Sequence, residues 1–343
     1  MIRIGIVGTG NTVSIAERHL KGILEDGRGA VSCVYNRNMD TAEAWVRRHG
    51  LDAVAAHSYE ELLDKVDAVI ICTPNSSHAS LAIKAMEREK HVLLEKPLGV
   101  TLKECREIQE AANRYPGIKM VGFTNRFSPV VKKAKEYFKE MGEVFSLTAY
   151  TGGKRLADPE IGVEWRMKRE LSGSGALCDF GSHLLDLSLF LTGRKYEAVT
   201  AMMDTVIKER KGERVENDDM ASIICSAPGT LGTFTVSRVG MDSLRLIASG
   251  EGGMVEFSLR DKGYVTFWEK KRTGGYTQRQ ETWYGNGDDP FIGEIGTFID
   301  GIQNKDVGYP TIEDALYVSK VLAAAEKAAE EKREVLVETQ EIT

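Results

Sequence analysis

The sequence contains no long apolar run, few cysteines and no excess of positive charge. No stretch approaches the ~18 apolar residues of a membrane-spanning helix, and the N-terminal residues lack the apolar core and cleavage site of a secretory signal. The five cysteines are scattered without C-x-x-C spacing, which argues against a disulfide framework and a zinc site. Lysine and arginine number 45 against 51 aspartates and glutamates, which excludes a chain-wide basic surface for nucleic acid. We therefore expect a cytoplasmic protein with neither nucleic acid nor a membrane as partner.

Residues 1–125 alternate short apolar runs with helical patterns. The expected strands are Ile2–Val7, Val31–Tyr35, Ala53–Ala55, Ala68–Cys72, His91–Leu94 and Lys119–Phe123. Strands that alternate with helices form a parallel sheet, so we predict an α/β domain with a doubly wound sheet over residues 1–125. Ligands of such sheets bind at the carboxyl ends of the strands.

After Pro129 the strand-like runs follow one another directly. The expected strands are Val144–Tyr150, Met220–Cys225, Gly232–Ser237, Leu244–Ser249, Met254–Leu259, Tyr264–Trp268 and Tyr276–Trp283. Helical patterns lie near Pro129–Glu140, Ser182–Thr192, Pro290–Asn304 and Thr311–Lys332. Successive strands joined by turns form antiparallel sheets. The pattern therefore predicts a second, α+β domain over residues 126–343.

Two glycines directly follow the first expected strand, at Gly8 and Gly10. Glycines there permit a tight turn and let backbone N–H groups approach a pyrophosphate at the start of the next helix. The candidate cofactor-binding residues of this turn are Gly8, Gly10, Asn11 and Thr12. Val13 replaces the third glycine of the usual G-x-G-x-x-G pattern, and an ordinary strand–helix turn is the alternative for so short a motif. The position of the glycines within the α/β alternation favours a nucleotide.

The end of the second expected strand bears on the choice of cofactor. A dinucleotide fold that prefers NAD usually carries an acidic residue there, which binds the ribose 2′-hydroxyl. This chain has Asn36 followed by Arg37, and arginine can pair bidentately with a 2′-phosphate. We therefore expect NADP or NAD, with NADP slightly favoured. The alternative is that Arg37 is simply a solvated residue.

Further polar residues follow the fourth and fifth expected strands. Thr73, Pro74, Asn75 and His78 follow the fourth, and Glu95, Lys96 and Pro97 follow the fifth. We expect the first four, with Glu95 and Lys96, to contact the cofactor. An ammonium at Lys96 is suited to hold a substrate oxygen and to stabilise developing negative charge. A structural histidine and a surface lysine before a turn are the alternatives for these motifs taken singly.

The segment Ser172–Asp186 places Asp179, His183 and Asp186 four and then three residues apart, so on a helix they share one face. The remainder of this helical pattern is apolar nearly all round, so its polar stripe needs partners or a cleft. Histidine, with an unperturbed pKa of ~6.5, is suited to act as a general base. The alternatives are a solvent-facing stripe or a core histidine satisfied by Asp179. No third ligand has a convincing spacing, so we expect no metal.

Together these motifs resemble the Gfo/Idh/MocA family, named after glucose–fructose oxidoreductase, inositol dehydrogenase and rhizopine-catabolism proteins, over nearly the whole chain. The matching segments are Gly8-Thr9-Gly10, Ile15–His19, Thr73-Pro74-Asn75 with His78, Glu95-Lys96-Pro97, Gly122–Pro129, Trp165-Arg166, Ser172–Asp186 and Asn217–Ala221. The E-K-P tripeptide together with D-x-x-x-H is the most specific combination. Thr12-Val13-Ser14 looks like a short insertion, and Asn36 departs from the family's acidic residue.

The resemblance implies a Rossmann domain followed by a domain with an open, mostly antiparallel sheet that forms a homodimer or homotetramer interface. It implies hydride transfer between NAD(P) and a sugar, polyol or related secondary alcohol or carbonyl. Lys96, Asp179 and His183 are then the expected catalytic residues, and with Arg126 they are the expected substrate contacts. Trp165 and Arg166 are expected to line the cofactor or substrate pocket.

Two other functions remain open at this point. The family also includes glycosidases that hold NAD tightly and oxidise their substrate only transiently. A non-catalytic, nucleotide-sensing protein is the second alternative, although it would have no need of Lys96, Asp179 and His183 together.

Overall fold

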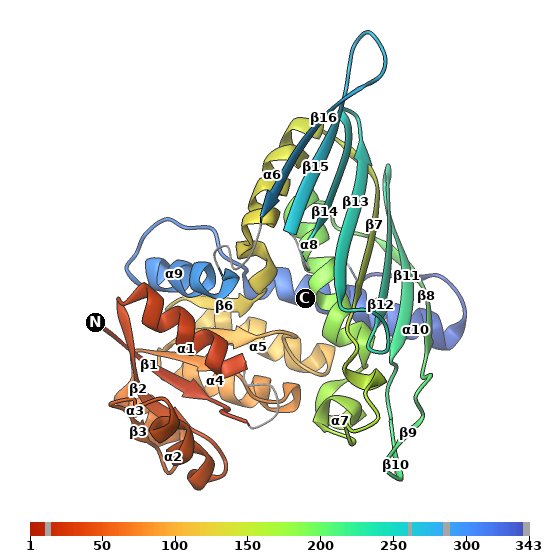
Figure 1. Cartoon of the computed structure of the whole chain (residues 1–343). Helices are drawn as coiled ribbons and strands as arrows, with labels where there is room; N and C mark the ends of the chain where they lie inside the picture. The colour runs from red at the N-terminus through yellow and green to blue at the C-terminus, as the bar shows by residue number, and fades with distance from the viewer. Residues whose placement is uncertain (11–14, 260–262, 284–288, 339–343) are drawn as a thin grey trace. The chain divides into compact units, whose positions relative to one another are not determined.

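The computed structural model describes residues 1–10, 15–259, 263–283 and 289–338 (Figure 1). The chain forms two compact units, each built from two segments. Unit 1 comprises Met1–Phe127 and Asp288–Leu316, and unit 2 comprises Ser128–Gly287 and Tyr317–Thr343. No helix among the described residues is long and apolar enough to cross a membrane.

Unit 1 contains a six-stranded sheet in the order β3-β2-β1-β4-β5-β6, with every neighbouring pair parallel. Its strands are β1 (Ile2–Val7), β2 (Gly29–Tyr35), β3 (Val54–Ala55), β4 (Ala68–Ile71), β5 (His91–Glu95) and β6 (Lys119–Gly122). The order reverses between β1 and β4, which makes the sheet doubly wound. This confirms the predicted sheet, and all six strands lie within two residues of their expected bounds.

Helices cover both faces of this sheet. They are α1 (Ile15–Asp26), α2 (Met39–Arg48), α3 (Tyr59–Lys65), α4 (His78–Glu87), α5 (Leu102–Arg114) and α9 (Pro290–Ile302), with short turns η1 (Asn75–Ser77) and η2 (Thr124–Phe127). Ile4 and Ile6 share one core with α1, α2 and α9. Gly5 lies between them and faces Leu62 of α3. Alternate residues of a strand point to opposite faces, so α3 lies on the face opposite α1.

Helix α9 belongs to unit 1 although it follows the second sheet in sequence. It packs so closely on α1 that a Cβ at Gly22 would lie 2.8 Å from both the Phe291 carbonyl oxygen and the Ile295 side chain. Ile295, Phe298 and Ile299 complete the core around α1. A division at residue 125 therefore omits one layer of the first unit, because the amphipathic pattern of α9 does not reveal which sheet it covers.

Unit 2 contains a nine-stranded sheet in the order β16-β15-β14-β13-β7-β12-β11-β8-β17. Its strands are β7 (Val144–Gly152), β8 (Ala198–Asp204), β11 (Met220–Ala227), β12 (Thr230–Ser237), β13 (Ser243–Gly250), β14 (Gly253–Ser258), β15 (Gly263–Lys270), β16 (Tyr276–Trp283) and β17 (Val335–Leu336). Only the β7–β12 pair is parallel among these neighbours. The mostly antiparallel sheet is thus confirmed, with β8 and β17 as additions to the expected strands.

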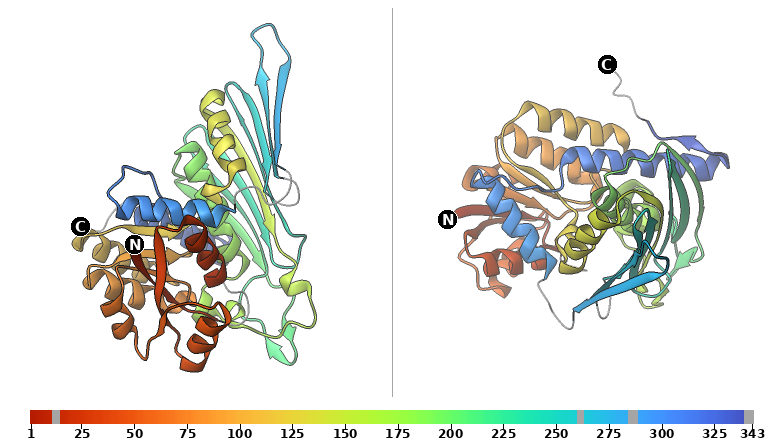
Figure 2. Two further views of the ribbon diagram at one scale, coloured as in Figure 1. Left: turned by 60° about the vertical axis from the view of Figure 1, so that its left-hand side comes forward. Right: turned by 90° about the horizontal axis from the view of Figure 1, so that it is seen from above.

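Helices α6 (Pro129–Met141) and α8 (Ser182–Thr192) pack on one face of this sheet (Figure 2). Phe234, Phe257 and Phe267 are fully buried in the sheet. The remaining elements are η3 (Arg155–Ala157), η4 (Trp165–Met167), α7 (Arg169–Ser172), η5 (Leu177–Gly181), a small hairpin of β9 (Glu209–Arg210) and β10 (Glu213–Arg214), and α10 (Ile312–Glu331), which crosses the unit boundary.

Candidate active site

In unit 1, the turn after β1 is built around Gly8. Its φ is +94°, and a Cβ there would lie 2.8 Å from the Thr73 side chain and 2.9 Å from the Cys72 carbonyl. The Gly8 N–H donates to the Tyr35 carbonyl at 3.0 Å. Only glycine fits this backbone conformation and this close approach. The sharp turn predicted at this position is therefore present.

The residues after Gly8 are arranged around a buried threonine. Asn36 Nδ2 donates to the hydroxyl of Thr9 at 3.4 Å, which brings the end of β2 to this turn. A Cβ at Gly10 would meet no described atom within 4 Å, so the backbone there is open to a ligand. Asn11 and Thr12, the other two residues predicted for this loop, lie outside the described residues.

Arg37 lies at the carboxyl end of β2 and is exposed. Asn36 occupies the preceding position, where NAD-preferring folds place a carboxylate. The side chain of Asn36 also accepts a hydrogen bond from the Asn38 N–H at 3.0 Å. The end of β2 therefore offers an amide and a guanidinium.

His78 bridges two of the predicted motifs. Its ring is fully buried, with Nδ1 2.8 Å from the Pro97 carbonyl oxygen and Nε2 3.0 Å from the Thr73 carbonyl oxygen. Burial lowers the pKa of the imidazole. Both ring nitrogens face the backbone, so His78 supports the turns that carry Thr73 and Lys96. Asn75 is also buried, in the adjoining turn η1.

Glu95 ends β5 inside a buried acid–base cluster. Its Oε1 lies 2.7 Å from His19 Nε2, and His19 Nδ1 lies 3.7 Å from Glu294 Oε2. Thr124 Oγ1 donates to the other oxygen of Glu294 at 2.9 Å. Burial, and then the neighbouring Glu95 carboxylate, hold the pKa of Glu294 well above its usual range. Lys96 follows directly and is half-buried, so this cluster anchors the strand end that presents its ammonium.

The two substrate contacts expected from unit 1 differ in their surroundings. Arg126 is buried in η2, where its guanidinium pairs with Asp314 Oδ2 at 3.1 Å and lies 5.8 Å from the centre of the Phe123 ring. Through these contacts Arg126 has a structural role within unit 1. Lys96 lies at the carboxyl edge with Gly8 and Thr73, as the parallel sheet predicts.

In unit 2, a small pocket forms around Asp179. Its lining residues are Gly153, Leu156, Glu164, Arg166, Met167, Asp179, Phe180 and Arg238. Arg166 extends from η4, with its guanidinium 4.4 Å from the centre of the Trp165 ring. Apolar walls with a few charged groups are typical of sites for small polar ligands. The predicted residues Arg166 and Asp179 are therefore brought together in one pocket.

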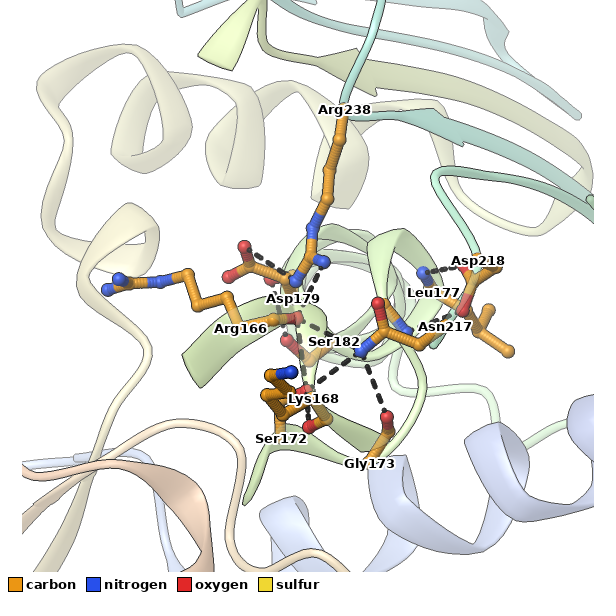
Figure 3. Close-up of polar contacts among 11 residues, drawn as sticks. Arg166, Lys168, Ser172, Gly173, Leu177, Asp179, Ser182, Asn217, Asp218 and Arg238 are labelled. Carbon is orange, nitrogen blue, oxygen red and sulfur yellow. Dashed lines mark hydrogen bonds and ion pairs between the residues drawn. The ribbon is translucent and has the colours of Figure 1, made fainter. Parts of the chain in front are cut away.

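Asp179 lies on η5, a π-helical turn immediately before α8, rather than on α8 itself. His183 is in the first turn of α8 and is half-buried, whereas Asp186 is fully buried. Asp179 Oδ2 pairs with the guanidinium of Arg238 at 3.4 Å, and the Asp179 carbonyl accepts from Ser182 Oγ at 3.3 Å (Figure 3). Single π-helical turns next to α-helices are frequently found at functional sites.

The segment before Asp179 is held by a buried loop at Asn217 and Asp218. Asp218 accepts backbone N–H groups from Gly175 at 2.5 Å and Leu177 at 2.8 Å. Desolvation nevertheless raises the pKa of this carboxyl. Asn217 Nδ2 donates to the Arg166 carbonyl at 2.9 Å (Figure 3). The loop therefore joins η4 to the start of η5.

Sequence reasoning missed Arg238 and Glu294. Arg238 directly follows the apolar pattern of β12, and Glu294 lies within the apolar pattern of α9. No sequence motif marks either residue. His19 and Asp218 lay within quoted motifs but were given no role. The signal that these four residues share is an ionisable side chain in an otherwise buried stretch. Among the described residues, no group of three or more His, Cys, Asp and Glu side chains could hold a metal ion.

Two family models match the chain. Residues 2–123 match the model described as "Oxidoreductase family, NAD-binding Rossmann fold", and residues 131–256 match the "GFO/IDH/MocA C-terminal domain". Together they cover more than half of the chain. The first match lies within unit 1 and the second lies within unit 2.

Individual proteins are similar as well. The chain is 32% identical to levoglucosan dehydrogenase of Pseudarthrobacter phenanthrenivorans over 67% of its own length and 60% of that protein. It is 25% identical to myo-inositol 2-dehydrogenase of Thermotoga maritima over 98% of this chain and 99% of that one. A solved structure of levoglucosan dehydrogenase in complex with NADH superposes with a TM-score of 0.89 at 25% identity, covering 99% of this chain and all of the other (100%).

Proposed function

The chain belongs to the Gfo/Idh/MocA family of NAD-binding oxidoreductases, and from this membership we propose that it is an NAD(P)-dependent dehydrogenase of a sugar, polyol or related secondary alcohol. The observation that carries the proposal is the carboxyl edge of the parallel sheet, where Gly8, Thr73 and Lys96 follow three neighbouring strands. That edge is where doubly wound sheets bind nucleotides and present catalytic groups. Relatives that act on levoglucosan and myo-inositol support a carbohydrate-like substrate.

The described residues of the first turn fit a dinucleotide. Gly8 has a backbone that excludes a side chain, a Cβ at Gly10 would meet no atom of the described residues within 4 Å, and Asn36 contacts Thr9 between them. Backbone N–H groups at such a turn suit a pyrophosphate. We assign further contacts to Asn11, Thr12, Thr73, Pro74, Asn75, Glu95, Trp165 and Arg166. NAD(P), when bound, supplies the nicotinamide that exchanges a hydride with the substrate carbon.

The protein's own groups handle the proton and the oxygen. We assign to His183 the role of general base that accepts the hydroxyl proton, a role for which the unperturbed pKa of histidine, ~6.5, is suited. The Lys96 ammonium donates to the same oxygen and stabilises the negative charge that develops there. Asp179 orients His183 or a neighbouring hydroxyl. Holding these groups in place also lowers the barrier, because orientation in advance removes part of its entropic cost.

NADP is the favoured cofactor in this proposal. The end of β2 offers the exposed guanidinium of Arg37 and no carboxylate. A guanidinium suits the 2′-phosphate, which a carboxylate would repel. The contacts of Asn36 to Thr9 and Asn38 place this strand end at the glycine turn.

We also propose that the chain forms a homodimer or homotetramer through the sheet of unit 2. Met202, Ile224 and Leu231 are more than half exposed on β8, β11 and β12, which are neighbours in the sheet. Ile223 and Cys225, on either side of Ile224, are buried, so the exposed residues lie on the other face. Apolar side chains gathered on an exposed face are typical of an interface.

Two substitutions test the catalytic assignment. We expect Lys96→Ala and His183→Ala each to lower turnover about 100-fold or more, because each removes a charge-stabilising or proton-accepting group. NADPH affinity, measured by fluorescence titration, should change little. Lys103→Ala on the surface of α5 and His57→Ala in an exposed loop are matched controls. Wild-type turnover in both active-site variants would refute the mechanism.

A further inference from the structure

Arg238 follows the last residue of β12 and has no assigned role, yet its side chain is only 6% exposed. Its main chain is held on both sides. The Arg238 N–H donates to the Asp219 carbonyl at 2.8 Å, and its carbonyl accepts from the Leu156 N–H at 3.1 Å. The side chain therefore enters the pocket from a fixed backbone.

A guanidinium removed from water needs acceptors, because an unpaired buried charge is costly. Arg238 finds two of them in different directions. Nη1 donates to the Arg166 carbonyl at 2.9 Å, and Nη2 pairs with Asp179 Oδ2 at 3.4 Å (Figure 3). The planar fork of arginine makes two such contacts at a fixed angle, whereas the single ammonium of lysine cannot reproduce them.

These contacts join two parts of the pocket wall. The Arg166 carbonyl belongs to η4, which carries Trp165, and Asp179 belongs to η5, which leads into α8. The Arg166 carbonyl also accepts from Asn217 Nδ2, so η4 is held from two sides. Asp179 itself is 26% exposed and lines the pocket with Arg238.

We propose that Arg238 is a positioning residue, which holds the Asp179 carboxylate and the η4 turn in the arrangement that dehydrogenation requires. Its catalytic consequence rests on the proposed function, since it acts through Asp179. The claim that Arg238 holds these two segments in place does not depend on the proposed function. Arg238 contributes no proton and needs no contact with the substrate.

Hydrogen–deuterium exchange of residues 164–182 tests the positional part in the intact protein. In Arg238→Met, we expect backbone amides of η4 and η5 to exchange about tenfold faster or more, since tenfold corresponds to ~1.4 kcal/mol in the opening equilibrium. Arg238→Lys keeps the charge and should exchange at an intermediate rate. Arg245→Met removes an ion pair with Glu256 in the same sheet and should leave residues 164–182 unchanged. Unchanged exchange in Arg238→Met would overturn the proposal.

Kinetics test whether Arg238 acts through Asp179. With myo-inositol and levoglucosan as probes, Arg238→Met should lower kcat about tenfold or more while the NADPH dissociation constant stays within about twofold. Asp179→Asn with Arg238→Met should be slower than Asp179→Asn alone by clearly less than the loss that Arg238→Met causes in the wild type. A merely structural residue would multiply the two losses, and that result would overturn the proposal. If the wild type oxidises neither probe, the assigned substrate class fails, and the exchange measurement alone decides whether Arg238 holds this segment.

Discussion

Replacing Glu294 by glutamine should change how the stability of the protein depends on pH. Glu294 is fully buried in α9, with one oxygen accepting from Thr124 and the other 3.7 Å from His19 Nδ1. Burial and the nearby Glu95 keep its pKa well above the usual range, so the folded protein holds this proton to a higher pH than the unfolded chain does. Glutamine has the shape of that protonated form and can still accept from Thr124.

The sign and size of the effect follow from proton linkage. In the unfolded chain a glutamate ionises near pH ~4.3, whereas the folded carboxyl, with its raised pKa, keeps its proton to a higher pH. The stabilisation is therefore fully present below the unfolded pKa and is lost as pH rises through the folded one. Over the window in which only the unfolded state ionises, one proton changes the free energy of unfolding by about 1.4 kcal/mol per pH unit. Glutamine does not titrate, so this contribution disappears.

Urea titrations at pH 5, 6 and 7 measure the difference between Glu294→Gln and the wild type. We expect the variant to gain on the wild type as pH rises, by about 1.4 kcal/mol per pH unit while only the unfolded state ionises, at an unchanged dependence on urea. Glu43→Gln, which removes an exposed pair with Arg47 on α2, is the control and should show no such trend. A difference that stays constant from pH 5 to 7 would show that Glu294 is already ionised, and the reasoning would fail.

Three further predictions concern the pocket wall, the cofactor and the assembly. Gly175→Ala should destabilise unit 2 by about 3 kcal/mol in urea titrations, because its Cβ would overlap the Asp218 carbonyl; a loss below that of Gly193→Ala, where the φ is +69° and the space is open, would contradict this. Arg37→Ala should weaken NADPH binding about tenfold and leave NADH binding nearly unchanged, and tighter NADH than NADPH binding in the wild type would refute the NADP preference. Light scattering should give at least twice the chain mass for the wild type and a lower mass for Ile224→Lys, and a monomeric wild type would remove the proposed interface.

The strands of unit 1 were predictable because buried parallel strands read as continuous apolar runs. Ile2–Val7 and Ala68–Ile71 are examples, and both were located to within a residue. β8 was missed, because its apolar run is short, is interrupted by Thr200 and ends at Asp204. β17 has only two residues and exists through its pairing with β8.

The candidate site was predictable where a motif follows a strand. The carboxyl ends of parallel strands lie at one edge of the sheet, so the sequence alone predicts Gly8, Thr73 and Lys96 at that edge. The π-turn at Asp179 was not predictable, because the 3.6-residue period that suggests one continuous helix carries no sign of it. Its start depends on the Asp218 carboxylate, which holds Leu177 from 41 residues away.

The order of most elements, the parallel and antiparallel sheets, and the glycine, lysine and histidine motifs could be predicted from the residues, because these depend on local backbone preference and short periodicity. Tertiary packing alone returns α9 to unit 1, places His19 between Glu95 and Glu294, and pairs Arg238 with Asp179. These contacts join residues far apart in the chain. Their energies come from burial and charge pairing, which depend on the neighbours that folding supplies and not on the residues alone.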